Sequence, residues 1–241
     1  MSNSWSYELA LAAPLRMAGE TLAAALAVVE RHGFSAYNPW TGRVSVITAS
    51  GLDEDFSSVD DALALLLREE GGVQLWWDEV DIDFSAYSWR DAPAATESAG
   101  ASAIPSGVRL GLGIDNTWYR QRVEDVATTM RQLFVDLCAQ LRPLCGYSFD
   151  EDFWELLAHD SALQKDVLEQ KQPSVLYWLN YYPNFYAHVV DLGALEGLGA
   201  RVTAIQNGVV VSFFEWPWDM DVRSLVHTNQ QWREWLRTHR G

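Results

Sequence analysis

The order of helix-like and strand-like segments restricts the fold more than any other feature of the sequence. Apolar residues recur at helical spacing over about residues 16–31, 59–67 and 123–141. The β-branched and aromatic runs between them come in neighbouring groups, and Asn207-Gly208 between two such runs predicts a tight hairpin. Runs of adjacent strands with intervening helices are typical of α+β proteins. We therefore predict an α+β fold with a mainly antiparallel sheet and helices packed on one face.

The 241 residues are long enough for one large domain or two small ones, and we expect a single α+β domain over residues 1–241. Val73 to Trp89 and Val108 to Tyr119 each have the pattern of one long strand. Residues 91–107 are dominated by Ala, Ser, Pro and Thr, which predicts a mobile loop between these strands. Each half of the chain has helices followed by a strand pair, which leaves a pseudo-repeat open.

Two local signals frame the segment that precedes the first long strand. Gly51 to Phe56 is polar, and we expect it to be a loop. Ser58, followed by Asp61 three residues later, resembles the start of a helix, because a serine side chain can accept a hydrogen bond from the exposed backbone N–H groups there.

The charge balance excludes several classes of partner. Lys and Arg number 17 against 33 Asp and Glu, so the formal net charge is −16. A nucleic-acid-binding protein needs a basic surface, and an anionic membrane surface also attracts basic segments. We therefore expect no nucleic-acid partner and no membrane partner. The phosphate-loop and zinc-ligand patterns are absent from the sequence, so we predict no cofactor and no metal.

The cysteines and the N-terminus suggest a compartment. Cys138 and Cys145 are the only two cysteines, and their spacing around one helix end does not suit a disulfide. Two lone cysteines fit a reducing environment and a buried packing role. The apolar stretch Leu9 to Leu15 is preceded by Glu8 and by no Lys or Arg, which is unlike an export signal. We expect a cytoplasmic protein.

Negative charge is concentrated in one part of the chain. Residues 51–91 carry twelve acids and only two bases, Arg68 and Arg90. If Leu75 to Phe84 is one strand, Trp77, Glu79, Asp81 and Asp83 share a face, because side chains alternate with a period of two. Such carboxylates repel one another and need water, a cation or a basic partner.

Three interpretations of this acidic face stay open. It could be a solvated sheet face that Arg109 partly balances from the neighbouring strand. It could bind a basic protein. It could be a metal or catalytic site that uses Asp81 and Asp83.

Tryptophan is the second unusual feature, with 12 in the chain. Most fit an aromatic core, but Trp77 and Trp218 stand beside acids and are candidate anchors, since aromatic side chains dominate many interfaces. The predicted partner-binding residues are Trp77, Glu79, Asp81, Asp83, Asp53, Glu54, Asp55 and Trp218.

Part of the sequence resembles bacterial immunity proteins of polymorphic-toxin and contact-dependent systems. The resemblance covers about half of the chain and rests on Gly146-Tyr147, Tyr177-Trp178-Leu179-Asn180-Tyr181-Tyr182, Tyr186, Leu192-Gly193, Asn207-Gly208 and Glu215-Trp216-Pro217-Trp218-Asp219. It implies a cytoplasmic, non-enzymatic protein that binds and blocks one toxin. The acidity would suit a basic toxin such as a nuclease.

The sequence therefore predicts an immunity-like protein that binds and neutralises a basic protein toxin through an acidic, Trp-bearing surface. Two alternatives remain: a metal-dependent enzyme using Asp81 and Asp83, and a cytoplasmic structural or regulatory adaptor.

Overall fold

The computed structural model describes residues 4–12, 18–77, 80–89, 107–150, 162–219 and 221–239. The chain divides into two compact units. The N-terminal unit is Ala10–Leu112, and the C-terminal unit combines Met1–Leu9 with Gly113–Gly241. Strands β1 (Ser4–Leu11) and β6 (Gly107–Asp115) each contribute residues to both units. The predicted loop at 91–107 lies outside the described residues, apart from Gly107.

The α+β class and the antiparallel sheet are confirmed. In the N-terminal unit the strand order is β3-β2-β4-β5-β6, where the strands are β2 (Val44–Thr48), β3 (Asp53–Phe56), β4 (Gly71–Trp77) and β5 (Val80–Trp89). The pairs β2 with β3, β2 with β4 and β4 with β5 are all antiparallel. Helices α1 (Gly19–Arg31) and α2 (Val59–Glu69) complete the unit.

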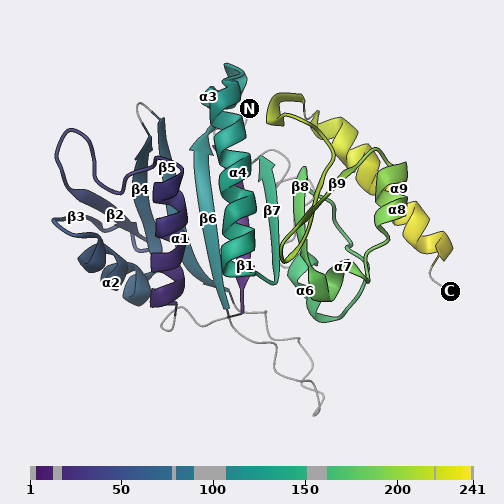
Figure 1. Cartoon of the computed structure of the whole chain (residues 1–241), viewed down its shortest axis with the longest axis horizontal. Helices are drawn as coiled ribbons and strands as arrows, with labels where there is room; N and C mark the ends of the chain where they lie inside the picture. The colour runs from purple at the N-terminus through teal and green to yellow at the C-terminus, as the bar shows by residue number, and fades with distance from the viewer. Residues whose placement is uncertain are drawn as a thin grey trace, which may run out of the picture. The chain divides into compact units, whose positions relative to one another are not determined.

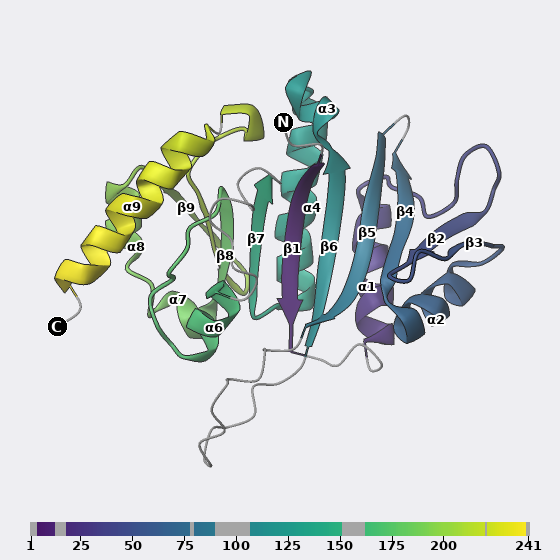
Figure 2. The same ribbon diagram turned by 180° about the vertical axis from the view of Figure 1, so that it is seen from behind.

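The two helices cover one side of these strands. Leu22, Ala25, Leu26 and Val29 form the predicted apolar stripe of α1, and all four are buried. Figure 1 shows α1 in front of the strands, and Figure 2 shows the same strands from the side that α1 leaves uncovered. Helix α2 begins after Ser58 as predicted, with the Asp61 backbone N–H donating to the serine hydroxyl at 3.2 Å.

The C-terminal unit has the strand order β1-β7-β8-β10-β9. Its remaining strands are β7 (Cys145–Asp150), β8 (Leu179–Pro183), β9 (Arg201–Ile205) and β10 (Gly208–Ser212). Its helices are α3 (Asn116–Arg120), α4 (Glu124–Leu141), α6 (Ala162–Leu168), α7 (Asn184–Ala187), α8 (Leu192–Gly197), η2 (Pro217–Asp219) and α9 (Val222–His239).

Aromatic side chains fill both sides of this second group of strands. Tyr7 of β1 lies 5.9 Å from Phe134 of α4, between ring centroids. On the other side Tyr147 of β7 stacks on Tyr177 at 4.4 Å. Cys138 and Cys145 are both buried and are not joined in a disulfide, as predicted.

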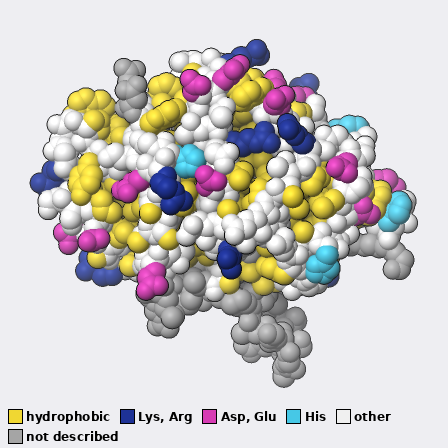
Figure 3. All heavy atoms as spheres, viewed as in Figure 1, with side chains coloured by type: hydrophobic (Ala, Val, Ile, Leu, Met, Phe, Trp, Pro, Cys, Tyr) yellow, Lys and Arg dark blue, Asp and Glu magenta, His cyan; other side chains and the backbone are white. Residues whose placement is uncertain are grey.

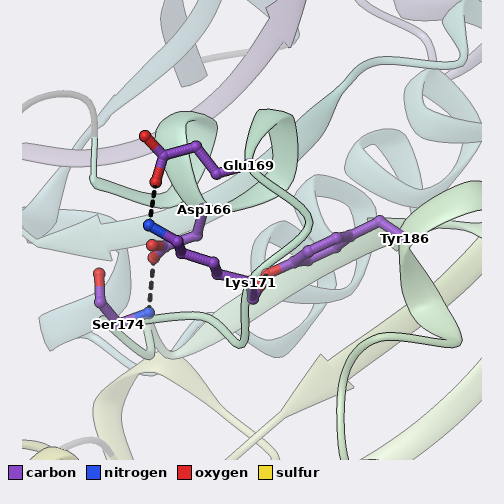
Figure 4. Close-up of polar contacts among 5 residues, drawn as sticks. All are labelled: Asp166, Glu169, Lys171, Ser174 and Tyr186. Atoms are coloured by element: carbon purple, nitrogen blue, oxygen red, sulfur yellow. Dashed lines mark hydrogen bonds and ion pairs between the residues drawn. The ribbon is translucent and has the colours of Figure 1, made fainter.

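A loop between α6 and β8 is held by side chains from three helices. The Asp166 carboxylate accepts a hydrogen bond from the Ser174 backbone N–H at 2.6 Å, and the Tyr186 hydroxyl donates to the Lys171 carbonyl (Figure 4). The Trp232 indole of α9 donates to the Pro173 carbonyl. Burial raises the pKa of the Asp166 carboxyl, although its hydrogen bonds with Ser174 act in the opposite direction.

Three predicted boundaries are wrong, and each error has a local cause. Residues 53–56 form strand β3 rather than a loop, because β2 pairs with this polar segment. Val73 to Trp89 is a hairpin of β4 and β5 rather than one strand. The second long strand ends at Asp115, and α3 follows it.

The predicted hairpin near Asn207-Gly208 is present, but its turn lies one residue earlier. Gly208 pairs with Ile205, so Gln206 and Asn207 make the turn and Gly208 belongs to β10. A Cβ atom at Gly208 would lie 2.2 Å from the Tyr182 carbonyl oxygen. Glycine is needed there for the close approach of a neighbouring strand rather than for turn geometry.

Candidate partner-binding face

The hairpin register decides which side chains of β4 and β5 share a face. Trp76 pairs with Asp81, Gln74 with Asp83, and Trp77 with Val80. Directly opposed residues of an antiparallel pair project to the same side of the sheet. Trp76, Asp81 and Asp83 therefore lie on the side that α1 does not cover, while Trp77 lies on the helix-covered side with Val80.

The predicted grouping of Trp77 with Asp81 and Asp83 is thus wrong. Counting alternation through the chain assumed one continuous strand, whereas the chain reverses between Trp77 and Val80 and the parity changes there. The Trp77 ring lies 5.7 Å from the Phe34 ring, between centroids, and contacts the position of Gly33 at the end of α1. Glu79 lies outside the described residues.

The neighbouring strands continue the uncovered side, which we call the outer face. Ser45 pairs with Asp55, and Ile47 pairs with both Asp53 and Gly72. The outer face is defined by Asp53 and Asp55 of β3, Ser45 and Ile47 of β2, Gln74 and Trp76 of β4, and Asp81, Asp83 and Ser85 of β5. Glu54 pairs with the buried Val46 and therefore belongs to the opposite side of β3.

Four aspartates thus share one face of three consecutive strand pairs. The rise of about 3.4 Å per residue puts alternate positions, such as Asp81 and Asp83, about 7 Å apart, and strands about 4.8 Å apart put β3 and β5 about 14 Å from each other. The Debye length at physiological ionic strength is about 8 Å. The acids on this face therefore lie within one to two Debye lengths of one another. Their charges act on one another and on any approaching cation.

Neutral partners organise the carboxylates of this face. The Gln74 amide nitrogen donates to Asp81 Oδ2 at 2.8 Å, and the Ser45 hydroxyl donates to Asp55 Oδ1 at 2.7 Å. Arg43 donates to the backbone oxygen of Asp55 at 2.6 Å, which leaves the carboxylate charge in place. The pKa of the Asp83 carboxyl is raised, because partial burial removes water and because the negative charge of Asp81 lies nearby.

The opposite surface has a different charge distribution. Viewed from the side of α1, Lys and Arg side chains are interspersed with Asp and Glu side chains (Figure 3). Among the residues that the structure describes, the ion pairs Lys171–Glu169 and Arg237–Glu234 both involve acids outside the outer face.

Sequence reasoning missed two aromatic residues that lie at this face. Period-two alternation through one continuous strand puts Trp76 on the side opposite to Asp81, and no sequence pattern singles out Trp40, in the loop before β2. Trp40 is 74% exposed and packs edge-to-face on Trp76, with 5.1 Å between ring centroids. A turn signal at residues 78–79 would have revealed the correct parity, but both residues there are acidic and neither is Gly, Asn or Pro.

Trp218 belongs to the C-terminal unit and is half-buried. Its ring stacks on Trp216 with 5.1 Å between centroids and an interplanar angle of 9°. Part of the indole is therefore covered by its own neighbour.

The motif that carries the immunity-protein resemblance has a structural role. Trp178 is fully buried, and its indole nitrogen donates to the Phe214 carbonyl at 3.1 Å. The Asn180 side chain bonds both the N–H and the C=O of Tyr177. The Tyr181 hydroxyl donates to the Asn207 carbonyl. These residues fix the backbone around β8 and β10, and they are not available at the surface.

Within the described ranges there is no group of three or more His, Cys, Asp or Glu side chains that could hold a metal ion. None of the helices in those ranges combines the length and hydropathy required to cross a membrane.

The chain has structural similarity to proteins of solved structure. No family model matches the chain, and no curated protein matches it. A Pseudomonas aeruginosa T6SS protein of solved structure aligns with a TM-score of 0.47 and 12% sequence identity, over 95% of this chain and 71% of that one.

Proposed function

We propose that this chain is a non-enzymatic, immunity-like protein that binds and neutralises a basic protein toxin, with the outer face as its binding surface. The observation that carries the proposal is the gathering of Asp53, Asp55, Asp81 and Asp83 on the sheet face that α1 leaves uncovered (Figure 2). A basic partner would offset their mutual repulsion, and its encounter would be accelerated by the field of the face.

The aromatic residues at this face supply the second element of an interface. Charges at an interface mainly speed association, whereas buried aromatic side chains slow dissociation. Trp76 and the exposed Trp40 provide such apolar area beside the carboxylates. We place the protein in a cytoplasm, where its two buried thiols stay reduced.

The test uses a basic candidate toxin, sought first among the proteins encoded by the genes that adjoin the gene of this chain. Its association rate is measured by stopped-flow fluorescence over a range of salt concentrations. The test variant combines Asp53→Asn, Asp55→Asn, Asp81→Asn and Asp83→Asn. The matched control removes four exposed charges elsewhere in the N-terminal unit, through Glu20→Gln, Glu30→Gln, Asp60→Asn and Glu69→Gln.

We expect the outer-face variant to associate about tenfold more slowly at low salt and to show a shallower salt dependence. The control should keep a rate much closer to that of the unmodified protein, because its charges lie on other surfaces. Equal rates for the unmodified protein and the outer-face variant would refute the proposal, and so would equal losses in the two variants. Far-UV circular dichroism establishes that both variants are folded.

A further inference from the structure

Trp40 is an exposed tryptophan on an ordered turn. The Asn38 side chain accepts hydrogen bonds from the backbone N–H groups of Trp40 at 2.9 Å and Thr41 at 3.0 Å. The Gly42 N–H donates to the Asn38 carbonyl at 2.8 Å, which closes the turn. The turn therefore presents the indole outward, with 74% of the residue exposed to water. A tryptophan that buries so little of its large apolar surface in its own fold is free to bury it against a partner.

Trp76 joins this indole to the carboxylates of the outer face. It contacts Trp40 edge-to-face, with an interplanar angle of 86°, and is the cross-strand partner of Asp81. The Trp76 indole nitrogen is shielded from water and has no hydrogen-bond partner among the residues that the structure describes. Gln74 donates to Oδ2 of Asp81, and this hydrogen bond does not use the second oxygen of the carboxylate. Two indole rings and an oriented carboxylate are thus adjacent.

This combination selects for one kind of ligand group. An indole face attracts cations, and a carboxylate can accept two parallel hydrogen bonds from a guanidinium. Arginine can lie flat on a ring and present its N–H fork to a carboxylate, whereas the lysine ammonium is a compact and strongly hydrated charge. A neutral group, such as a sugar, could also stack on Trp40, but it would leave the repulsion between Asp81 and Asp83 uncompensated.

We propose that Trp40, Trp76 and Asp81 form a subsite that takes one arginine side chain of the protein partner. The inference rests on the proposed function, because it specifies the chemistry of the partner at the same face. The raised pKa of the neighbouring Asp83 agrees with it, since a bound guanidinium would favour the ionised carboxylate.

The experiment uses two peptides of equal charge as probes, hexalysine and the same peptide with one central arginine. Their binding to the full chain is measured by isothermal titration calorimetry at low salt. We expect the arginine peptide to bind about three- to fivefold more tightly than hexalysine. Trp40→Ala and Asp81→Asn should each remove this preference. Phe185→Ala, which removes another exposed aromatic side chain, should leave it intact.

The outcomes separate this inference from the proposed function. Equal affinity for the two peptides, no binding of either, or a preference that survives Trp40→Ala would each overturn the arginine subsite. None of these results bears on the association rate of the toxin with the four-aspartate variant, which tests the proposed function by itself. Because Trp40 is mostly exposed, Trp40→Ala should unfold at nearly the same temperature as the unmodified protein.

Discussion

Inside the C-terminal unit, the side chain of Asn229 in α9 forms hydrogen bonds with the backbone groups of Leu176. Its side chain is fully buried, and its amide oxygen accepts a hydrogen bond from the Leu176 N–H at 2.8 Å. Its amide nitrogen donates to the Leu176 carbonyl at 2.8 Å and to the Leu225 carbonyl at 3.0 Å. Leu176 is also fully buried, so water cannot take over either bond. The substitution Asn229→Ala therefore leaves both backbone groups of Leu176 without a partner.

The cost follows from these two groups. Each buried polar group left without a partner costs about 1–3 kcal/mol, so the pair gives about 2–6 kcal/mol. Alanine recovers about 0.5 kcal/mol, because it has a higher helix propensity than asparagine. We expect the free energy of unfolding to fall by about 3–4 kcal/mol. For a chain of this size, that corresponds to a decrease in the melting temperature of about 6–16 °C.

Urea unfolding followed by circular dichroism and tryptophan fluorescence measures this loss. The control is Gln230→Ala, since Gln230 is exposed on the same helix, and it should change stability by less than about 0.5 kcal/mol. Amide hydrogen exchange adds a local readout, because the Leu176 N–H should lose protection in Asn229→Ala. A loss below about 1 kcal/mol, with Leu176 still protected, would show that the reasoning from unpaired buried groups is wrong.

Three further predictions concern single contacts. Gly208→Ala should lower the free energy of unfolding by about 1–3 kcal/mol or more, because the added Cβ would lie 2.2 Å from the Tyr182 carbonyl oxygen. Gly197→Ala, with open space around it, should leave the free energy of unfolding unchanged in the same denaturation assay. Ser58→Ala removes the cap of α2 and should lower the free energy of unfolding by about 1 kcal/mol, as read from thermal melts. Burial raises the pKa of Asp166 in the folded state, so the folded chain binds that proton more tightly than the unfolded chain. The contribution of Asp166 to the free energy of unfolding should therefore fall as pH rises from the ordinary aspartate pKa through the raised value. Urea midpoints measured across that pH range should show this decrease in the unmodified protein, and Asp166→Asn should lack it.

Some of these features are local in sequence, and sequence reasoning identified them. Helix α4 follows from apolar residues at helical spacing, and the start of α2 follows from Ser58 and Asp61. Both depend on residues within one or two helical turns of each other. The hairpin of β9 and β10 was also predicted, but the reason for Gly208 was not, because that glycine responds to a third strand.

The acidic segment itself was evident from composition, since charge concentration needs no structure to be seen. The arrangement of these acids on the sheet was not evident from the composition. The chain reverses between Trp77 and Val80 without a glycine, asparagine or proline that would indicate a turn. The side-chain alternation of one continuous strand was therefore expected across this point. That error put Trp77 in the place of Trp76 and grouped the wrong tryptophan with the aspartates.

The sequence by itself determined that this chain is an acidic α+β protein and which segment carries most of the negative charge. The tertiary structure alone decided which acids lie together and which indole accompanies them. Side-chain alternation along a strand is a local property, but the side on which a strand begins depends on its pairing with strands elsewhere in the chain. The exposure of Trp40 was likewise a tertiary result, because it depends on what the rest of the fold leaves uncovered.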